Sequence, residues 1–160
     1  MPYSLLFVNS HVSCGMEWYY FTYNPLPFIF RTGKHPMSDT PKPTDINLHQ
    51  KSRMLDISFN DGNSYQLSCE FLRIYSPSAE VRGHGPGEEV LQFGKKDVNI
   101  TNIEPVGSYG ICLHFDDNHD TGIYSWEWLH HLGKNHDELW ADYLDKLNAA
   151  GKKRETDTII

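Results

Sequence analysis

The sequence predicts an α+β fold: a mainly antiparallel sheet with helices packed on one face, and a helix at the C-terminal end. Two observations carry this prediction. A pattern of strand, tight turn, strand and serine-capped helix occurs twice, over residues 53–74 and 110–132. Apolar side chains then recur with helical spacing over residues 136–150. With 39% hydrophobic residues, a chain of 160 residues is long enough to bury one core.

Residues 1–36 differ in composition from the rest of the chain. They hold nine of the chain's 21 aromatic side chains and only three charged ones, and the composition becomes polar at Met37. We therefore predict that residues 1–36 are a non-native or disordered extension and that Met37 is the native initiator. A polar lead-in over residues 37–52 precedes the predicted domain, which covers residues 53–150.

The first copy of the repeated pattern begins with a strand expected at residues 53–59. Residues 60–63 read Asn-Asp-Gly-Asn, which is typical of a tight hairpin turn, and a second strand is expected at residues 64–67. Ser68 is a favourable N-cap, so a short helix should continue through Ile74.

Residues 76–87 show neither the period of a helix nor that of a strand. They combine two prolines and three glycines with ionisable side chains. A loop of this length inside a compact domain is usually functional or disordered. Beyond it, a strand is predicted at residues 89–93 and a short extended piece at residues 98–100.

The second copy of the pattern is one residue longer than the first. Its predicted elements are strands at residues 101–106, 110–115 and 121–124, and a helix from Ser125 to Leu132. Gly133 should end that helix. The last helix is predicted over residues 136–150, with Asn135 and Glu138 at capping-box spacing. Residues 151–160 are predicted to be a tail.

Charge and cysteine content exclude several classes of protein. The formal net charge is −7 and most basic residues are scattered, so we expect no nucleic-acid partner. The three cysteines are far apart and form no C-x-x-C motif, which indicates a reducing, cytoplasmic compartment. No apolar stretch is long enough to cross a bilayer, so no membrane association is expected.

No catalytic motif is recognisable, and we expect no enzyme. Residues 116–122 have the acidic spacing of a calcium loop, but Thr121 stands where the sharp turn requires glycine. His114 and Asp116 match the H-x-D of a non-haem iron site, but the large barrel that this chemistry uses is missing. No serine or cysteine lies in an elbow motif.

The best candidates for metal ligands are His84 and His119, with Glu80, Asp117 and Asp120 as possible oxygen donors. Imidazole and carboxylate together would suit Fe(II) or another divalent ion. The alternative is that His84 hydrogen-bonds its own loop and that His119 fills the turn. Because the chain has nine histidines, such clusters also arise by chance.

From residue 53 to residue 148 the chain resembles the gamma-butyrobetaine hydroxylase-like N-terminal domain family, and most closely its short stand-alone bacterial members. The motifs that carry the resemblance are Phe71-Leu72-Arg73, residues 76–84 (Ser-Pro-Ser-Ala-Glu-Val-Arg-Gly-His), residues 115–122 (Phe-Asp-Asp-Asn-His-Asp-Thr-Gly) and residues 124–129 (Tyr-Ser-Trp-Glu-Trp-Leu). The resemblance implies a compact α+β fold. Similar modules form the N-terminal part of eukaryotic carnitine-synthesis hydroxylases and a C-terminal extension of some P-loop ATPases that carry iron–sulfur clusters.

In the hydroxylases that the chain resembles, this module binds a structural zinc through three cysteines and one histidine. The alignment places Ser76, Ser78 and Val81 at the cysteine positions and His119 at the histidine position. Neither serine nor valine can replace a thiolate, so the zinc site is not carried over. The catalytic barrel of the hydroxylases is absent too, so the resemblance implies no oxygenase activity.

The sequence leaves two functions open. One is a small non-catalytic accessory module that binds an unknown protein partner and is linked to iron–sulfur or other metal handling. The other is a metal-binding protein in its own right. The residues predicted to form the working surface lie in the 76–87 loop and the 116–122 turn: Ser76, Ser78, Glu80, Arg82, His84, His119 and Asp120.

Overall fold

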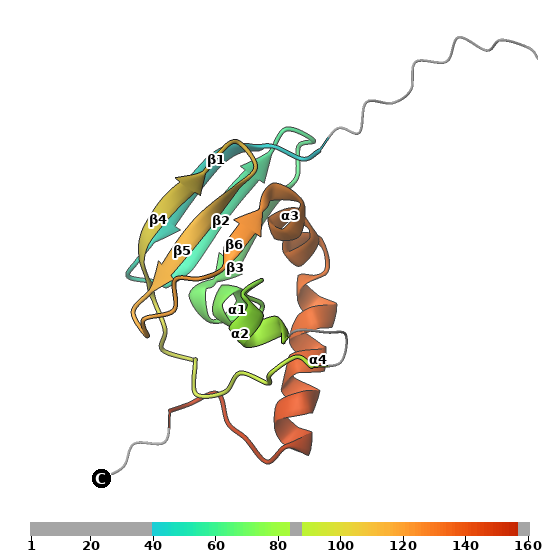
Figure 1. Ribbon diagram of the computed structural model, residues 1–160. Helices are drawn as coiled ribbons and strands as arrows, with labels where there is room; N and C mark the ends of the chain where they lie inside the picture. The colour runs from blue at the N-terminus through green and yellow to red at the C-terminus, as the bar shows by residue number, and fades with distance from the viewer. Residues whose placement is uncertain (1–39, 84–87, 157–160) are drawn as a thin grey trace, which may run out of the picture. The chain divides into compact units, whose positions relative to one another are not determined.

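The computed structural model describes residues 40–83 and 88–156. Figure 1 shows the strands and helices of this part of the chain. In chain order the elements are β1 (Pro43–His49), β2 (Met54–Phe59), β3 (Ser64–Ser68), α1 (Cys69–Ile74), α2 (Ala79–Arg82), β4 (Ile100–Val106), β5 (Gly110–Phe115), β6 (Ile123–Ser125), α3 (Trp126–Lys134) and α4 (His136–Ala149). The α+β class and the C-terminal helix are confirmed. The predicted extension over residues 1–36 lies outside the described residues.

The strands form two antiparallel sheets of three strands each, where the sequence predicted one sheet. Their orders are β1-β2-β3 and β4-β5-β6, and each sheet leads directly into a helix. Ser68 accepts a hydrogen bond from the Phe71 N–H at 3.1 Å, and Ser125 accepts one from the Trp128 N–H at 3.1 Å. These side chains satisfy N–H groups that the first helical turn leaves unpaired. The predicted repeat is therefore confirmed, and each copy contains a third strand as well.

The hairpin turns of the two copies also correspond bond for bond. The Phe59 N–H donates to the Asn63 carbonyl at 2.8 Å, and the Phe115 N–H donates to the His119 carbonyl at 3.0 Å. His119 thus takes the backbone position that Asn63 holds in the first copy. The repeat places this histidine at the end of a tight turn, and its side chain is 3% exposed.

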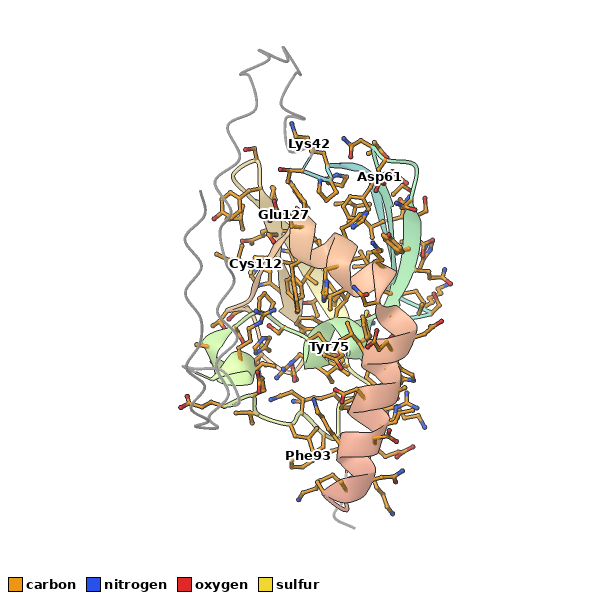
Figure 2. All side chains as sticks on the ribbon, turned by 90° about the vertical axis from the view of Figure 1, so that its right-hand side faces the viewer. Lys42, Asp61, Tyr75, Phe93, Cys112 and Glu127 are labelled. Carbon is orange, nitrogen blue, oxygen red and sulfur yellow. The ribbon has the colours of Figure 1, made fainter. Side chains whose placement is uncertain are left out.

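The core forms between the inward faces of the sheets and the helices. Alternation along β2 and β5 buries every second side chain: Leu55, Ile57, Phe59, Ile111, Leu113 and Phe115. All six residues of α1 are buried, and α1 lies between the sheets and α4 (Figure 1). Figure 2 shows Tyr75 beside α4, where its hydroxyl donates to the Leu139 carbonyl at 2.6 Å. None of the described helices is long and apolar enough to span a membrane.

The prediction of a polar lead-in over residues 37–52 is wrong for residues 43–49. This segment is β1, which pairs antiparallel with β2 from His49 opposite Met54 to Pro43 opposite Phe59. Ile46 and Leu48 pack against the core, while the other β1 side chains are more polar. β1 is an edge strand and carries only two strongly apolar residues, so the sequence pattern did not reveal it.

The predicted strand at residues 89–93 is wrong as well, because the structure assigns no strand there. The Val90 N–H donates to the Val81 carbonyl at 2.8 Å, and the Gln92 side-chain amide donates to the Val90 carbonyl at 2.9 Å. The main chain of this segment is thus hydrogen-bonded to the end of α2 and to a side chain, in place of a neighbouring strand. The loop predicted at residues 76–87 also contains the short helix α2.

Both predictions for the junction of α3 and α4, the helix end at Gly133 and the cap by Asn135, are wrong. Gly133 does not end α3, which continues to Lys134. A Cβ atom at Gly133 would clash with the ring of Tyr65, so this glycine serves a close approach of helix and strand. Asn135 makes no side-chain cap to α4; its side-chain amide donates to the His131 carbonyl at 2.8 Å.

The predicted tail is part of the folded domain through its first residues. The Arg154 Nε–H donates to Glu70 Oε1 at 2.8 Å, and the Glu70 side chain is only 5% exposed. The Gly94 N–H donates to the Lys153 carbonyl and the Lys96 N–H to the Arg154 carbonyl, each at 3.0 Å. Residues 152–156 therefore pack against residues 93–96 and neutralise a carboxylate of α1.

We expect Arg154→Ala to lower the free energy of unfolding by about 2–4 kcal/mol, because it leaves the Glu70 carboxylate buried without its cation. Lys153→Ala is the matched control: its backbone bond is retained, and the loss of its side chain should change stability by about 0.5 kcal/mol or less. Urea denaturation of both variants measures the difference. Equal effects would show that the ion pair with Glu70 does not stabilise the fold.

Candidate functional site

The candidate site lies where the segment after α1 meets the turn between β5 and β6. Ser76 follows the end of α1, Glu80 lies in α2 and His119 lies in the turn. Ser76 Oγ is 2.8 Å from His119 Nε2, and His119 Nδ1 is 3.1 Å from Glu80 Oε2. We call these three residues the trio. They confirm that the two segments predicted to form the working surface are adjacent.

Burial decides the protonation state of the trio. Burial lowers the pKa of His119, the Arg73 guanidinium lowers it further, and the Glu80 carboxylate opposes both. The ring is therefore neutral near pH 7. Its partners assign the proton to Nδ1, which donates to Glu80, while Nε2 accepts from the Ser76 hydroxyl. Ser76 Oγ in turn accepts from the Ser78 N–H at 3.4 Å.

The trio has the bonding order of a serine–histidine–acid triad. A nucleophile has to reach its substrate, but Ser76 is completely buried and His119 is 3% exposed. A Cβ atom at Gly122 would clash with Ser76 Oγ, so the turn backbone covers the hydroxyl closely. In this arrangement the trio fastens the loop to the turn and offers no access to a substrate.

The four positions that align with the hydroxylase zinc ligands do not fit zinc. Ser76, Ser78, Val81 and His119 are all buried, as expected for aligned positions. However, Ser76 and Ser78 offer hydroxyls, Val81 offers only carbon, and the His119 Nε2 atom is engaged by Ser76. Zinc sites of this kind need deprotonated sulfur ligands. The four residues therefore do not offer the ligands of such a zinc site.

Asp117 is held by two cations. Arg73 Nε donates to Asp117 Oδ2 at 2.9 Å, and Lys95 Nζ donates to the same oxygen at 2.6 Å. Burial raises the pKa of Asp117, but the Lys95 hydrogen bond and the Arg73 charge outweigh it and hold the pKa below its usual range. Asp117 is therefore an ionised partner of α1 and not a free metal ligand.

Asp120, another residue predicted as a metal ligand, lies beside a different histidine. Asp120 is 58% exposed and its carboxylate lies 3.9 Å from His114 Nδ1. His84 lies outside the described residues. Within residues 40–83 and 88–156, no three His, Cys, Asp or Glu side chains are placed to hold a metal ion. The metal site stays a prediction, and metal content by mass spectrometry would test it.

The predicted working surface is corrected in part. Ser76, Ser78 and His119 are buried, so they position the loop and offer no surface to a partner. Glu80, Arg82 and Asp120 are exposed as predicted. In a polar loop, the residue types are the same whether a side chain is buried and hydrogen-bonded or lies on the surface. The sequence pattern therefore could not distinguish the two.

Beside the trio lies a cavity of about 740 Å³ that opens to solvent. Its walls come from the end of α1, from α2, from the 89–92 segment, and from α3 and α4, and include Val81, Val90, Leu91, Trp128, Leu139 and Tyr143. The guanidinium of Arg82 lies 4.0 Å from the centroid of the Trp128 ring, in a cation–π contact at the rim. The apolar spacing over residues 136–150 predicted one face of a helix and gave no sign of the cavity that this face helps to line.

Comparisons with known proteins identify relatives. A family model described as gamma-butyrobetaine hydroxylase-like, N-terminal, matches residues 46–130. Two NMR solution structures are similar. One is 45% identical, and the match covers 75% of this chain and 95% of the other chain with a TM-score of 0.65. The second is 52% identical, and the match covers 80% of this chain and 97% of the other chain with a TM-score of 0.64. A crystal structure from Acidithiobacillus ferrooxidans, described as a protein with unknown function of the DUF971 family, is 34% identical and covers 57% and 92%, with a TM-score of 0.49. No curated protein matches.

Ser76→Ala and Ser78→Ala form a matched pair of buried substitutions. Ser76→Ala leaves the His119 Nε2 atom without a donor and should cost about 1–3 kcal/mol of unfolding free energy. The Ser78 hydroxyl has no partner among the described residues, so Ser78→Ala should change stability by about 0.5 kcal/mol or less, or raise it. Chemical denaturation tests the pair. A Ser78 variant as unstable as the Ser76 variant would contradict the assigned hydrogen bonds.

Acidification should destabilise the folded chain through His119. Its pKa lies below the usual 6.5 in the folded state, so the unfolded chain binds a proton first as the pH falls. The contribution of His119 is therefore complete above pH 6.5 and decreases below it until the pH passes the lowered pKa. In denaturation series between about pH 7.5 and 5, His119→Gln should lose this dependence. Identical pH profiles for the variant and the native chain would assign the effect to other groups.

Proposed function

The chain belongs to the gamma-butyrobetaine hydroxylase-like N-terminal domain family, and from this premise we propose that it is a non-catalytic module that binds a partner protein. The site supports this role best through one observation: a cavity of about 740 Å³ whose walls are held in place by the protein's own bonds. A concave site that is formed before its ligand arrives spends little free energy on ordering.

Several contacts hold the rim of the cavity. The trio fixes α2 to the turn between β5 and β6, and Arg82 at the end of α2 stacks on Trp128 of α3. Arg73 Nη1 donates to Gln92 Oε1 at 3.3 Å and the Val90 N–H donates to the Val81 carbonyl at 2.8 Å, which positions the 89–92 segment beside α2. Two of the positions that the hydroxylases use for zinc, Ser76 and His119, would here shape a binding surface through their hydrogen bond.

Exposed apolar side chains lie next to this cavity. Val90 lines it and is 53% exposed, and Phe93, three residues further on, is 47% exposed. We call the cavity and the side chains that border it (Arg82, Val90, Trp128 and Lys146) the docking face. An apolar centre with charged residues around it is the composition of a protein–protein interface, and exposed apolar groups beside a cavity favour contact with another protein.

The family context supports a partner in iron–sulfur or other metal handling. The module resembles a C-terminal extension of P-loop ATPases that carry iron–sulfur clusters, so a stand-alone copy could act on a similar protein as a separate chain. This part of the proposal rests on analogy of architecture. The buried trio supports a non-catalytic role, because Ser76 has no access to solvent.

A photo-crosslinking residue at position 90 tests the proposal in cells that make the protein naturally. Position 109 is the matched control, since Tyr109 is 55% exposed and Val90 is 53% exposed, but Tyr109 does not line the cavity. We expect one defined protein to be captured from position 90 and not from position 109. Equal capture at both positions, or none at either, would contradict a docking face at the cavity.

A further inference from the structure

A second cavity, of about 390 Å³, is lined by side chains from the end of α2, from β6 and from the first turns of α3. It shares Arg82 and Trp128 with the first cavity, and Ile123 and His131 line it as well. Because the two cavities have these side chains in common, a partner seated on the docking face comes within reach of the second cavity.

Arg82 is exposed and differs from the other described arginines. Within residues 40–83 and 88–156, no carboxylate lies at ion-pair distance from its guanidinium, whereas each of the others contacts one: Arg53, Arg73 and Arg154. The Arg82 guanidinium lies 4.0 Å from the centroid of the Trp128 ring, so one of its faces is covered. The N–H donors of a guanidinium lie in its plane. The stack therefore holds Arg82 in place and leaves these donors available to a ligand.

His131 brings a second donor to the same cavity. Its ring is stacked on Trp128, with 5.2 Å between the centroids and 16° between the planes. Asn135 Nδ2 donates to the His131 carbonyl at 2.8 Å, which fixes the orientation of the amide, and it lies 3.1 Å from His131 Nδ1. Nδ1 is therefore an acceptor, and the neutral ring carries its proton on Nε2. No described residue accepts a hydrogen bond from Nε2.

One carboxylate, that of Glu127, also lines the second cavity. Glu127 is exposed and makes no ion pair with Arg82 or His131. Water reaches this carboxylate and screens it, so it weakens the attraction of an anion without abolishing it. Two N–H donors that are stacked on one indole ring thus favour a ligand with a negatively charged acceptor.

We propose that the second cavity binds an aspartate or glutamate side chain of the partner protein, whose carboxylate accepts hydrogen bonds from Arg82 and His131. This inference rests on the proposed function and gives the partner its recognition chemistry. The planar fork of an arginine matches the two oxygens of a carboxylate, which adds orientation to the charge attraction. Stacking on Trp128 also lowers the entropy that Arg82 loses on binding. Arginine and tryptophan are enriched among the residues that dominate binding free energy at protein interfaces.

Blocked tripeptides test the carboxylate site on the full chain. The probe is acetyl-Ala-Glu-Ala-amide, and acetyl-Ala-Gln-Ala-amide is a control of nearly the same shape without the charge. Each is added to about 20 mM at low ionic strength, because a single exposed ion pair binds weakly. We expect the glutamate probe to shift the NMR signals of the Trp128 indole N–H and the Ile123 amide, and the glutamine probe to shift them much less.

Three variants that each change one charge assign the site. Arg82→Gln should bind the glutamate probe about fivefold more weakly or worse. Lys134→Gln removes an exposed cation of α3 that does not line the cavity, and it should bind the probe like the native chain. Glu127→Gln removes the repelling carboxylate and should bind the probe about twofold more tightly.

Four results would overturn the inference: no shifts at the second cavity, equal shifts with the two probes, equal affinity of Arg82→Gln and Lys134→Gln, or weaker binding by Glu127→Gln. The comparison of the probes uses the native chain, so it holds whether or not Arg82→Gln folds. Crosslinking at position 90 reports on the first cavity. Failure of the carboxylate site is thus distinguishable from failure of the proposed function.

Discussion

The hydrogen bond between Ser76 and His119 joins the two copies of the repeat where the end of one helix meets the hairpin turn of the other copy. Ser76 leaves the helix of the first copy, and His119 ends the hairpin turn of the second. Each copy alone would present an unfinished face, because three strands and one short helix bury little apolar surface. This hydrogen bond stabilises the fold because both of its atoms are buried, and a buried polar atom without a partner costs free energy. The orientation of α2, and with it one wall of the cavity, depends on this contact.

Helix α1 shows how a buried element can carry charge. Glu70 and Arg73 lie in a helix whose six residues are all buried, so both need partners that come from elsewhere in the chain. Arg154 supplies one and Asp117 the other. The first pair fixes the chain beyond α4, and the second fixes the turn that bears His119. Charge neutralisation in the core thus sets the positions of two segments that the apolar contacts alone would leave undetermined.

Local patterns predicted the parts of this fold that depend on neighbours in sequence. The serine caps, the hairpin turns and the strands β2 and β5 were predicted correctly because each rests on a few adjacent residues. The errors share a different cause. Strand β1 lies at the edge of its sheet, Gly133 packs closely against the ring of Tyr65, and Arg154 pairs with Glu70, which is far away in sequence. The cavity belongs to the same class, since five segments of the chain contribute to its walls.

The contact of Arg154 with Glu70 also has a consequence for the order in which the domain is completed during synthesis. The two residues are 84 positions apart, so the ribosome makes nearly all of the described domain before the cation for the buried carboxylate exists. Until then α1 can pack only with an unpaired charge or with a protonated Glu70, and both are unfavourable. Contacts that close such long loops form late in folding. The nascent domain would therefore stay loosely packed around α1 until Arg154 has left the ribosome.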